Sequence, residues 1–210
     1  MFALLPFLAP LLTKSGAVRA NPMGHDPKAD PLAEAALTDL RRLGAEIVDP
    51  ADIPKLGQYD EGELEVLLCE LKADLAQYFA WIGPQSPMHS LADVIAFNAA
   101  HAESEMPFFG QDLFELAQAK GPLTDADYVE ALASNRRLAG PEGIDAVMDA
   151  LHLDALVAPT TGPAWLIDHV NGDSSSGGSS SPAAVAGYPH ITVPAGQVAG
   201  LPVGLSFFGR

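Results

Sequence analysis

The chain has 210 residues, of which 48% are hydrophobic and 18% are charged, so it can form a packed core and does not have the composition of a disordered protein. Its 27 acidic and 11 basic residues give a formal net charge of −16, and no basic stripe is present that could neutralise phosphates; nucleic acid is therefore not an expected partner. The single cysteine, Cys69, excludes an internal disulfide and a cysteine-based zinc site.

The first residues are apolar without the full pattern of a secretory signal peptide. Residues 1–12 are interrupted by Pro6 and Pro10, and no Lys or Arg precedes them. We therefore expect a cytoplasmic protein, with a secretory signal at residues 1–20 as the weaker alternative. No run approaches the roughly 20 uninterrupted apolar residues that span a bilayer, so no membrane partner is expected. Residues 1–29 are treated as an atypical apolar N-terminal segment and residues 30–210 as the domain.

A helix followed by a short strand is the first clear unit. Asp30 is a suitable N-cap, Pro31 suits the first helical position, and leucines and alanines then repeat at helical spacing. Gly44 predicts the end of this helix, and residues 45–48 have the apolar pattern of a strand. A helix–strand step of this kind is typical of layered α/β sheets.

Amphipathic helices dominate the middle of the chain. Ser90 is a suitable N-cap for one of them, and the stretch Gly140–Gly143 predicts a break between the last two. The periodicity predicts helices over residues 63–79, 91–102, 111–119, 124–138 and 144–151.

Short apolar strands and one long loop make up the rest. Strands are predicted over residues 154–158, 191–193 and 203–208, and the Gly/Ser-rich stretch 160–181 lies between the first two. Loops of this length between buried strands are more often functional than not. The last strand ends two residues before the chain does, and no later helix could cover it, which predicts an incomplete domain.

Residues 154–209 contain a series of short motifs. In chain order they are Asp-Ala-Leu-Val-Ala-Pro-Thr (154–160), Gly-Pro-Ala-Trp (162–165), Asn-Gly-Asp (171–173), Gly-Ser-Ser-Ser-Pro-Ala-Ala-Val-Ala-Gly-Tyr-Pro (178–189), Ile-Thr-Val-Pro-Ala-Gly (191–196) and Gly-Leu-Pro-Val-Gly-Leu-Ser-Phe-Phe-Gly (200–209). Together they resemble the C-terminal portion of the amidase signature family. The likeness extends over residues 30–210, which we accordingly interpret as the C-terminal part of an amidase domain.

The resemblance implies an α/β fold, the C-terminal part of a mixed-sheet α/β/α sandwich of the amidase signature type. It also implies hydrolysis of a carboxamide C–N bond in a small amide substrate, without metal or organic cofactor. The family's site consists of a lysine, a bridging serine on a cis peptide and a nucleophilic serine, all from the half that precedes the part seen here. No lysine of this chain lies beside a Gly/Ser-rich loop at a strand end; the lysines are Lys14, Lys28, Lys55, Lys72 and Lys120. No catalytic residue is therefore assigned, and the chain is expected to be inactive by itself.

The Gly/Ser-rich loop is expected to form one wall of the substrate pocket. We assign substrate binding to Trp165, Asp168, Ser179 and Ser180: a large apolar face, a carboxylate for an amine or amide N–H, and two small hydroxyls. The competing interpretations are core packing for Trp165 and turn capping for Asp168 and Asp173, the latter favoured for Asp173 because it follows Asn-Gly. Ser181-Pro182 has the pattern of an N-cap and first helical residue.

Two other functions compete with this interpretation. The chain could be a non-catalytic binding or assembly module, or one half of a split amidase completed in trans by the missing N-terminal half. A metal enzyme is not expected, because the six histidines are scattered without metal-ligand spacing.

Overall fold

The computed structural model describes residues 14–20 and 26–210. The apolar run of residues 1–12 lies outside the described residues. Two compact units are present: the described part of Met1–Gln58 together with Arg136–Arg210, and Tyr59–Asn135. None of the helices in the described ranges has the length and apolar character needed to cross a membrane.

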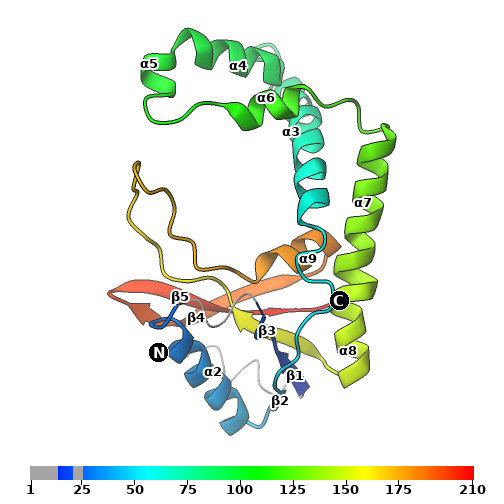
Figure 1. The fold of residues 1–210 in the computed structure, drawn as a ribbon, viewed down its shortest axis with the longest axis vertical. Helices are drawn as coiled ribbons and strands as arrows, with labels where there is room; N and C mark the ends of the chain where they lie inside the picture. Colours follow the sequence, from blue (N-terminus) through cyan, green and yellow to red (C-terminus); the bar gives the residue numbers. More distant parts are fainter. Residues whose placement is uncertain (1–13, 21–25) are drawn as a thin grey trace. The chain divides into compact units, whose positions relative to one another are not determined.

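The first unit contains a mixed five-stranded sheet (Figure 1). β1 pairs in parallel with β2 and β3, whereas β5 is antiparallel to both β3 and β4. The strand order is β2 (Glu46–Val48), β1 (Lys14–Ala17), β3 (Ala155–Pro159), β5 (Leu201–Phe208) and β4 (His190–Val198). The predicted strands are confirmed, and β4 and β5 are longer than expected because they form a hairpin that extends their pairing.

β1 is a strand that the sequence did not predict. Its residues Lys-Ser-Gly-Ala have neither an apolar run nor alternation, yet Ser15, Gly16 and Ala17 are all buried between β2 and β3. A Cβ added to Gly16 would lie 2.5 Å from Leu153 Cδ1 and 2.6 Å from Ala51 Cβ. The buried residues of β1 are small because their neighbours approach so closely.

Helices cover both faces of the sheet (Figure 1). On one face, Leu37 and Leu40 of α2 (Asp30–Arg42) pack with Leu205 and Phe207 of β5. On the other face, Phe208 packs with residues of η1 (Gly140–Ile144), α8 (Asp145–Leu151) and α9 (Ser180–Ala186). The prediction that β5 lacks cover is wrong, because helices from earlier in the chain supply it.

Helix α2 begins one residue earlier than predicted and ends where predicted. The N-cap is Ala29, one residue before the predicted Asp30, because the Asp26 carboxylate accepts hydrogen bonds from the N–H groups of Lys28 and Ala29. The predicted stop at Gly44 is confirmed: its φ of 101° lies in the left-handed region that favours glycine.

The predicted break at Gly140–Gly143 is wrong. The helical path continues from α7 (Ala126–Ala139) through the π-helix η1 into α8. Gly143 serves packing instead, because a Cβ at this position would lie 2.6 Å from the carbonyl oxygen of Leu138. A π-helical turn also places Pro141, which has no N–H to donate, near its own N-terminus.

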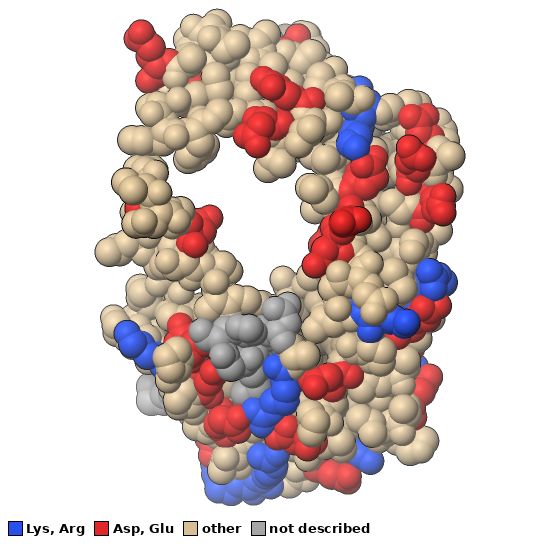
Figure 2. Space-filling model, in the orientation of Figure 1, with Lys and Arg blue, Asp and Glu red and all other residues tan. Residues whose placement is uncertain are grey.

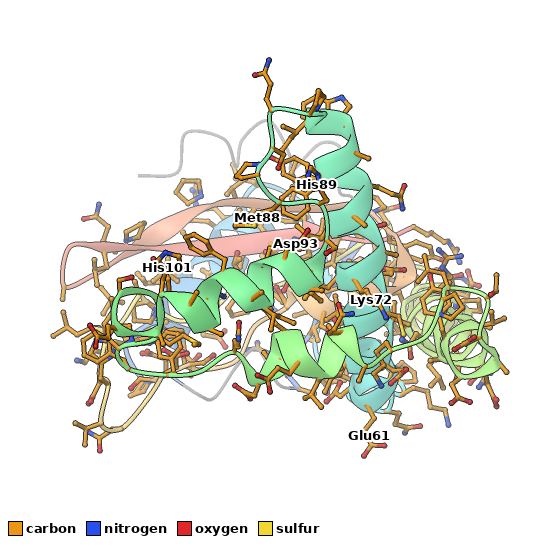
Figure 3. All side chains as sticks on the ribbon, turned by 90° about the horizontal axis from the view of Figure 1, so that it is seen from above. Glu61, Lys72, Met88, His89, Asp93 and His101 are labelled. Atoms are coloured by element: carbon orange, nitrogen blue, oxygen red, sulfur yellow. The ribbon has the colours of Figure 1, made fainter. Side chains whose placement is uncertain are left out.

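The second unit is helical. It consists of α3 (Asp60–Ile82), α4 (Leu91–Ala100), α5 (Ala102–Glu105), α6 (Asp112–Gln118) and the first part of α7. One core cluster joins α3, α4 and α6 through Leu68, Leu91 and Ala117. The predicted cap of α4 is confirmed, since Ser90 Oγ accepts the N–H of Asp93. The Asp93 carboxylate in turn accepts the N–H of His89 at 2.8 Å, and Figure 3 shows these two residues at the start of α4.

Candidate functional site

The Gly/Ser-rich loop leaves the sheet at the end of β3 and returns to it at the start of α9 (Figure 1). Its base is closed by main-chain hydrogen bonds: Ser179 donates to the Thr160 carbonyl at 3.1 Å, and Thr160 donates to the Gly204 carbonyl at 2.9 Å. The Thr161 hydroxyl donates to the Gly177 carbonyl at 2.8 Å. The loop is therefore anchored on β3 and β5 at the carboxyl end of β3, where α/β sheets commonly bind ligands.

Trp165 lies in the projecting part of this loop. Its side chain is 41% exposed, so it is not a core residue. The indole N–H donates a hydrogen bond to the Asp173 carboxylate at 3.1 Å, which fixes the orientation of the ring. Its two following residues, Leu166 and Ile167, are more exposed still. The loop thus presents an apolar surface to its surroundings.

Asp168 caps a turn within the loop. Its Oδ1 accepts the N–H groups of Val170 and Asn171, both at 2.9 Å, and its Oδ2 accepts the Asn171 side-chain amide at 2.7 Å. The Asn171 side chain, followed by these two backbone donors, holds the pKa of the Asp168 carboxyl below its usual value. Turn capping, favoured from sequence for Asp173, is the role that Asp168 has in the structure.

The two predicted serines differ in environment. Ser179 is buried, and its Oγ lies 3.4 Å from Nε2 of His190, which stacks on Phe208 with ring centroids 5.3 Å apart. Burial lowers the pKa of the His190 imidazole. Ser180 is exposed and is the first residue of α9, so the helix begins before the predicted N-cap Ser181.

A hydroxyl cluster under the loop was not found from sequence. Thr160 Oγ1 lies 2.7 Å from the buried Ser206 Oγ and 2.5 Å from Thr192 Oγ1. Thr192 and Ser206 are opposite one another in the β4–β5 register. A Cβ on Gly204 would lie 2.5 Å from Thr192 Oγ1 and 2.6 Å from Thr160 Oγ1, so the hydroxyls occupy space that glycine leaves open. No local sequence signal could have found this cluster, because only the strand register brings its members together.

The four residues predicted to bind substrate lie in two parts of the loop. Trp165 and Asp168 make their hydrogen bonds within the projecting loop, whereas Ser179 contacts the sheet at the loop's base. Whether the four residues bind substrate stays a prediction.

The ammonium groups of Lys14, Lys72 and Lys120 bind carboxylates or carbonyl oxygens. Lys72 Nζ donates to the carbonyl oxygens of Gln118 and Lys120, at 2.9 and 2.5 Å, and Figure 3 shows its place on α3. Lys14 Nζ lies 3.4 Å from Glu46 Oε1, and Lys120 pairs with Glu65. Within residues 14–20 and 26–210, no three His, Cys, Asp or Glu side chains converge as a metal site would require.

Comparison with known proteins assigns this chain to a family. The sequence model of the family Amidase matches residues 14–210. A probable amidase of Arabidopsis thaliana is 34% identical over 204 residues, covering 94% of this chain and 36% of the plant protein.

Solved structures give a similar result. The peptide amidase of Stenotrophomonas maltophilia is 48% identical with a TM-score of 0.84, covering 94% of this chain and 39% of that protein. A peptide amidase in complex with the competitive inhibitor chymostatin is 49% identical with a TM-score of 0.87. The match covers 94% of this chain and 40% of that protein. This chain therefore spans about 40% of the length of these structures, and it belongs to the amidase family, the amidase signature enzymes.

Proposed function

We propose that this chain contributes sheet strands, covering helices and one wall of the substrate pocket to an amidase that hydrolyses the carboxamide C–N bond of peptide amides. The substrate class is supported by the 48–49% identity to peptide amidases, one of them bound to a competitive inhibitor. The mixed sheet with its anchored Gly/Ser-rich loop supports the structural role. As the family resemblance implies, the proposed hydrolysis uses no metal or organic cofactor.

The chain by itself is proposed to be inactive. A serine hydroxyl attacks an amide only when a neighbouring base accepts its proton. Two observations carry this proposal: Lys14, Lys72 and Lys120 bind carboxylates or carbonyls, and the hydroxyl that lies 3.4 Å from His190 Nε2, that of Ser179, is buried. In the complete enzyme, a lysine and two serines from the remainder of the domain supply the reacting groups.

The pocket wall is proposed to consist of Trp165, Asp168, Ser179 and Ser180. Trp165 offers the exposed part of a ring that Asp173 holds in place. A carboxylate has about four acceptor positions, and Asp168 uses three for its turn, so one remains for a substrate N–H. Ser180 offers an exposed hydroxyl, while the buried Ser179 positions the base of the loop.

Ammonia release from a C-terminally amidated peptide by the purified chain tests the proposed inactivity. The expected rate is that of buffer. Turnover well above buffer that disappears in Ser179→Ala and Ser180→Ala, but persists in the matched loop variant Ser174→Ala, would make one of these serines a nucleophile and overturn the proposal.

A chimera tests the pocket wall. Here the 210 residues replace the matching part of the Stenotrophomonas maltophilia peptide amidase, to which they are 48% identical. We expect Trp165→Ala and Asp168→Asn to raise KM for a peptide amide about tenfold, with a smaller change in kcat. Unchanged KM in both variants, with Leu166→Ala as the control for a loop substitution, would remove these residues from the pocket.

A further inference from the structure

The hydroxyl cluster of Thr160, Thr192 and Ser206 contains more protons than its own hydrogen bonds use. Thr160 Oγ1 is central, because it contacts both other hydroxyl oxygens, at 2.5 Å for Thr192 and 2.7 Å for Ser206. It reaches both because Gly204 leaves the space open: a Cβ there would lie 2.6 Å from Thr160 Oγ1. Each hydroxyl has one proton to donate. Three protons serve two internal hydrogen bonds, so one proton is left for an acceptor outside the cluster.

Burial decides which hydroxyl has this spare proton. Ser206 is fully buried, and among residues 14–20 and 26–210 its hydroxyl has Thr160 as its one hydrogen-bond partner. If Ser206 did not donate to Thr160, its proton would stay in the core without an acceptor, at the full cost of desolvation. Thr160 then accepts from Ser206 and donates to Thr192. The proton that remains is that of Thr192, which is exposed and can donate outward.

Thr192 lies on the face of the sheet that supports the Gly/Ser-rich loop. It is opposite Ser206 in the β4–β5 register, and His190 is on the same face because it is two residues earlier in β4. His190 lies beside Ser179 at the base of the loop, and Thr160 accepts the main-chain N–H of Ser179. The spare donor is therefore next to the base of the loop.

The charge of the loop indicates which acceptor this donor can bind. Residues 160–181 include Asp168 and Asp173 but neither Lys nor Arg, and Figure 2 shows acidic side chains on this loop. A ligand carboxylate would be repelled by these charges, whereas a neutral carbonyl oxygen would not. A hydroxyl that the cluster has already oriented also loses little freedom when it binds a ligand. The expected acceptor is therefore a carbonyl oxygen.

We propose that the Thr192 hydroxyl donates a hydrogen bond to a carbonyl oxygen of the bound peptide amide. Thr160 and Ser206 are positioning residues, because they act by directing the Thr192 proton outward. This inference rests on the proposed function, which takes peptide amides as the substrate and the loop as a wall of the pocket. It adds a residue of β4 to that wall.

The test uses the purified 210-residue chain with isotope-labelled threonine methyl groups and, as the probe, N-acetylphenylalanine amide. Titration followed by nuclear magnetic resonance should shift the Thr192 methyl signal. Thr192→Val should weaken binding about fivefold, the equivalent of one ordinary hydrogen bond, and Thr192→Ser should bind as the parent does. Thr160→Val should also weaken binding, and Thr160→Ser should restore it. The matched control is Thr38→Val, because the Thr38 hydroxyl bonds only to the Glu34 carbonyl of its own helix.

Each outcome supports the proposal or overturns it. Circular dichroism confirms that each variant stays folded. A parent chain that does not bind the amide up to its solubility limit, or a Thr192→Val variant that binds it as the parent does, overturns the proposal. Equal or tighter binding of the free acid N-acetylphenylalanine also overturns it, because the acceptor would then not be a neutral carbonyl.

Ammonia release by the chimera described above is measured separately and tests the proposed function. Binding that depends on Thr192, together with a chimera that releases no ammonia, supports the hydroxyl donor and counts against the proposed function. Ammonia release by the chimera, together with binding that is indifferent to Thr192, has the opposite meaning.

Discussion

The indole N–H of Trp165 donates a hydrogen bond to the carboxylate of Asp173, eight residues further along the same loop. This bond joins the two sides of a loop whose central turn is capped by a different carboxylate, that of Asp168. One aspartate therefore orients the aromatic ring and the other shapes the turn.

Removing the Asp173 carboxylate should free the Trp165 ring. In a Trp81→Phe background, Trp165 is the sole tryptophan. Asp173→Ala is expected to shift its fluorescence emission to longer wavelength and to increase quenching by acrylamide, because the ring loses its tether. Asp127→Ala, an exposed aspartate on α7, is the control and should leave the emission unchanged. An unaltered spectrum in Asp173→Ala would show that the bond does not hold the ring.

Gly16 in β1 should not tolerate a methyl group. The added Cβ would meet Leu153 and Ala51 at 2.5 and 2.6 Å, which forces the core to shift. We expect Gly16→Ala to lower the free energy of unfolding by about 1–3 kcal/mol in urea denaturation. Gly110→Ala, where no atom lies within 4 Å of the new Cβ, should have little effect. Equal stability of the two variants would contradict the placement of β1 inside the sheet.

His190 should make stability depend on pH near neutrality. Burial lowers its pKa from the ordinary value of 6.5, so the unfolded chain binds the proton at a higher pH than the folded chain does. Stability must then fall as pH decreases through 6.5 towards the folded pKa. Melting temperatures between pH 8 and pH 5 should decline less steeply in His190→Gln than in the parent. An identical slope in His190→Gln and the parent would refute the prediction.

Arg19 and Asp49 should contribute stability that acid removes. The Arg19 guanidinium binds Asp49 and Glu34, and its hydrogen bonds hold the pKa of the Asp49 carboxyl below the ordinary 3.8. This contribution is present above pH 3.8 and is lost as the pH falls through the lower, folded value.

The measurement for this pair is urea denaturation at pH 7 and at pH 3. Asp49→Asn is expected to cost roughly 1 kcal/mol at pH 7, since the pair is partly exposed, and less at pH 3. Asp112→Asn removes the same charge from an exposed position on α6 and should cost little at either pH. A cost for Asp49→Asn that does not shrink in acid would contradict the assigned pKa direction.

Short-range signals were reliable where one hydrogen bond or one backbone angle decides the outcome. Ser90 caps α4 through the N–H of Asp93, and Gly44 ends α2 with a positive φ, both as predicted. The helix–strand step at the start of the domain and the strands of the motif-rich region were also confirmed. The family resemblance needed a long series of motifs in order, and the family model confirms it over residues 14–210.

Signals failed where distant residues decide the outcome. The sequence predicted a break at Gly140–Gly143, but the helical path is continuous, and a Cβ on Gly143 would lie 3.4 Å from both Ile53 and Pro54, which are distant in the chain. The sequence favoured Asp173 as the turn cap. In the structure the Asp173 carboxylate accepts the indole N–H of Trp165, and Asp168 caps the turn. The substrate-binding roles of Trp165, Asp168, Ser179 and Ser180 remain predictions.

By itself the sequence determined the family, the mixed α/β class and most helix positions, because periodicity, caps and ordered motifs are properties of neighbouring residues. Only the tertiary structure decided that Lys-Ser-Gly-Ala forms the inner strand β1, that helices from earlier in the chain cover β5, and that Thr160, Thr192 and Ser206 meet. The physical reason is that strand register and close packing join residues far apart in the chain, and no local pattern records which distant residues will share a face of the sheet.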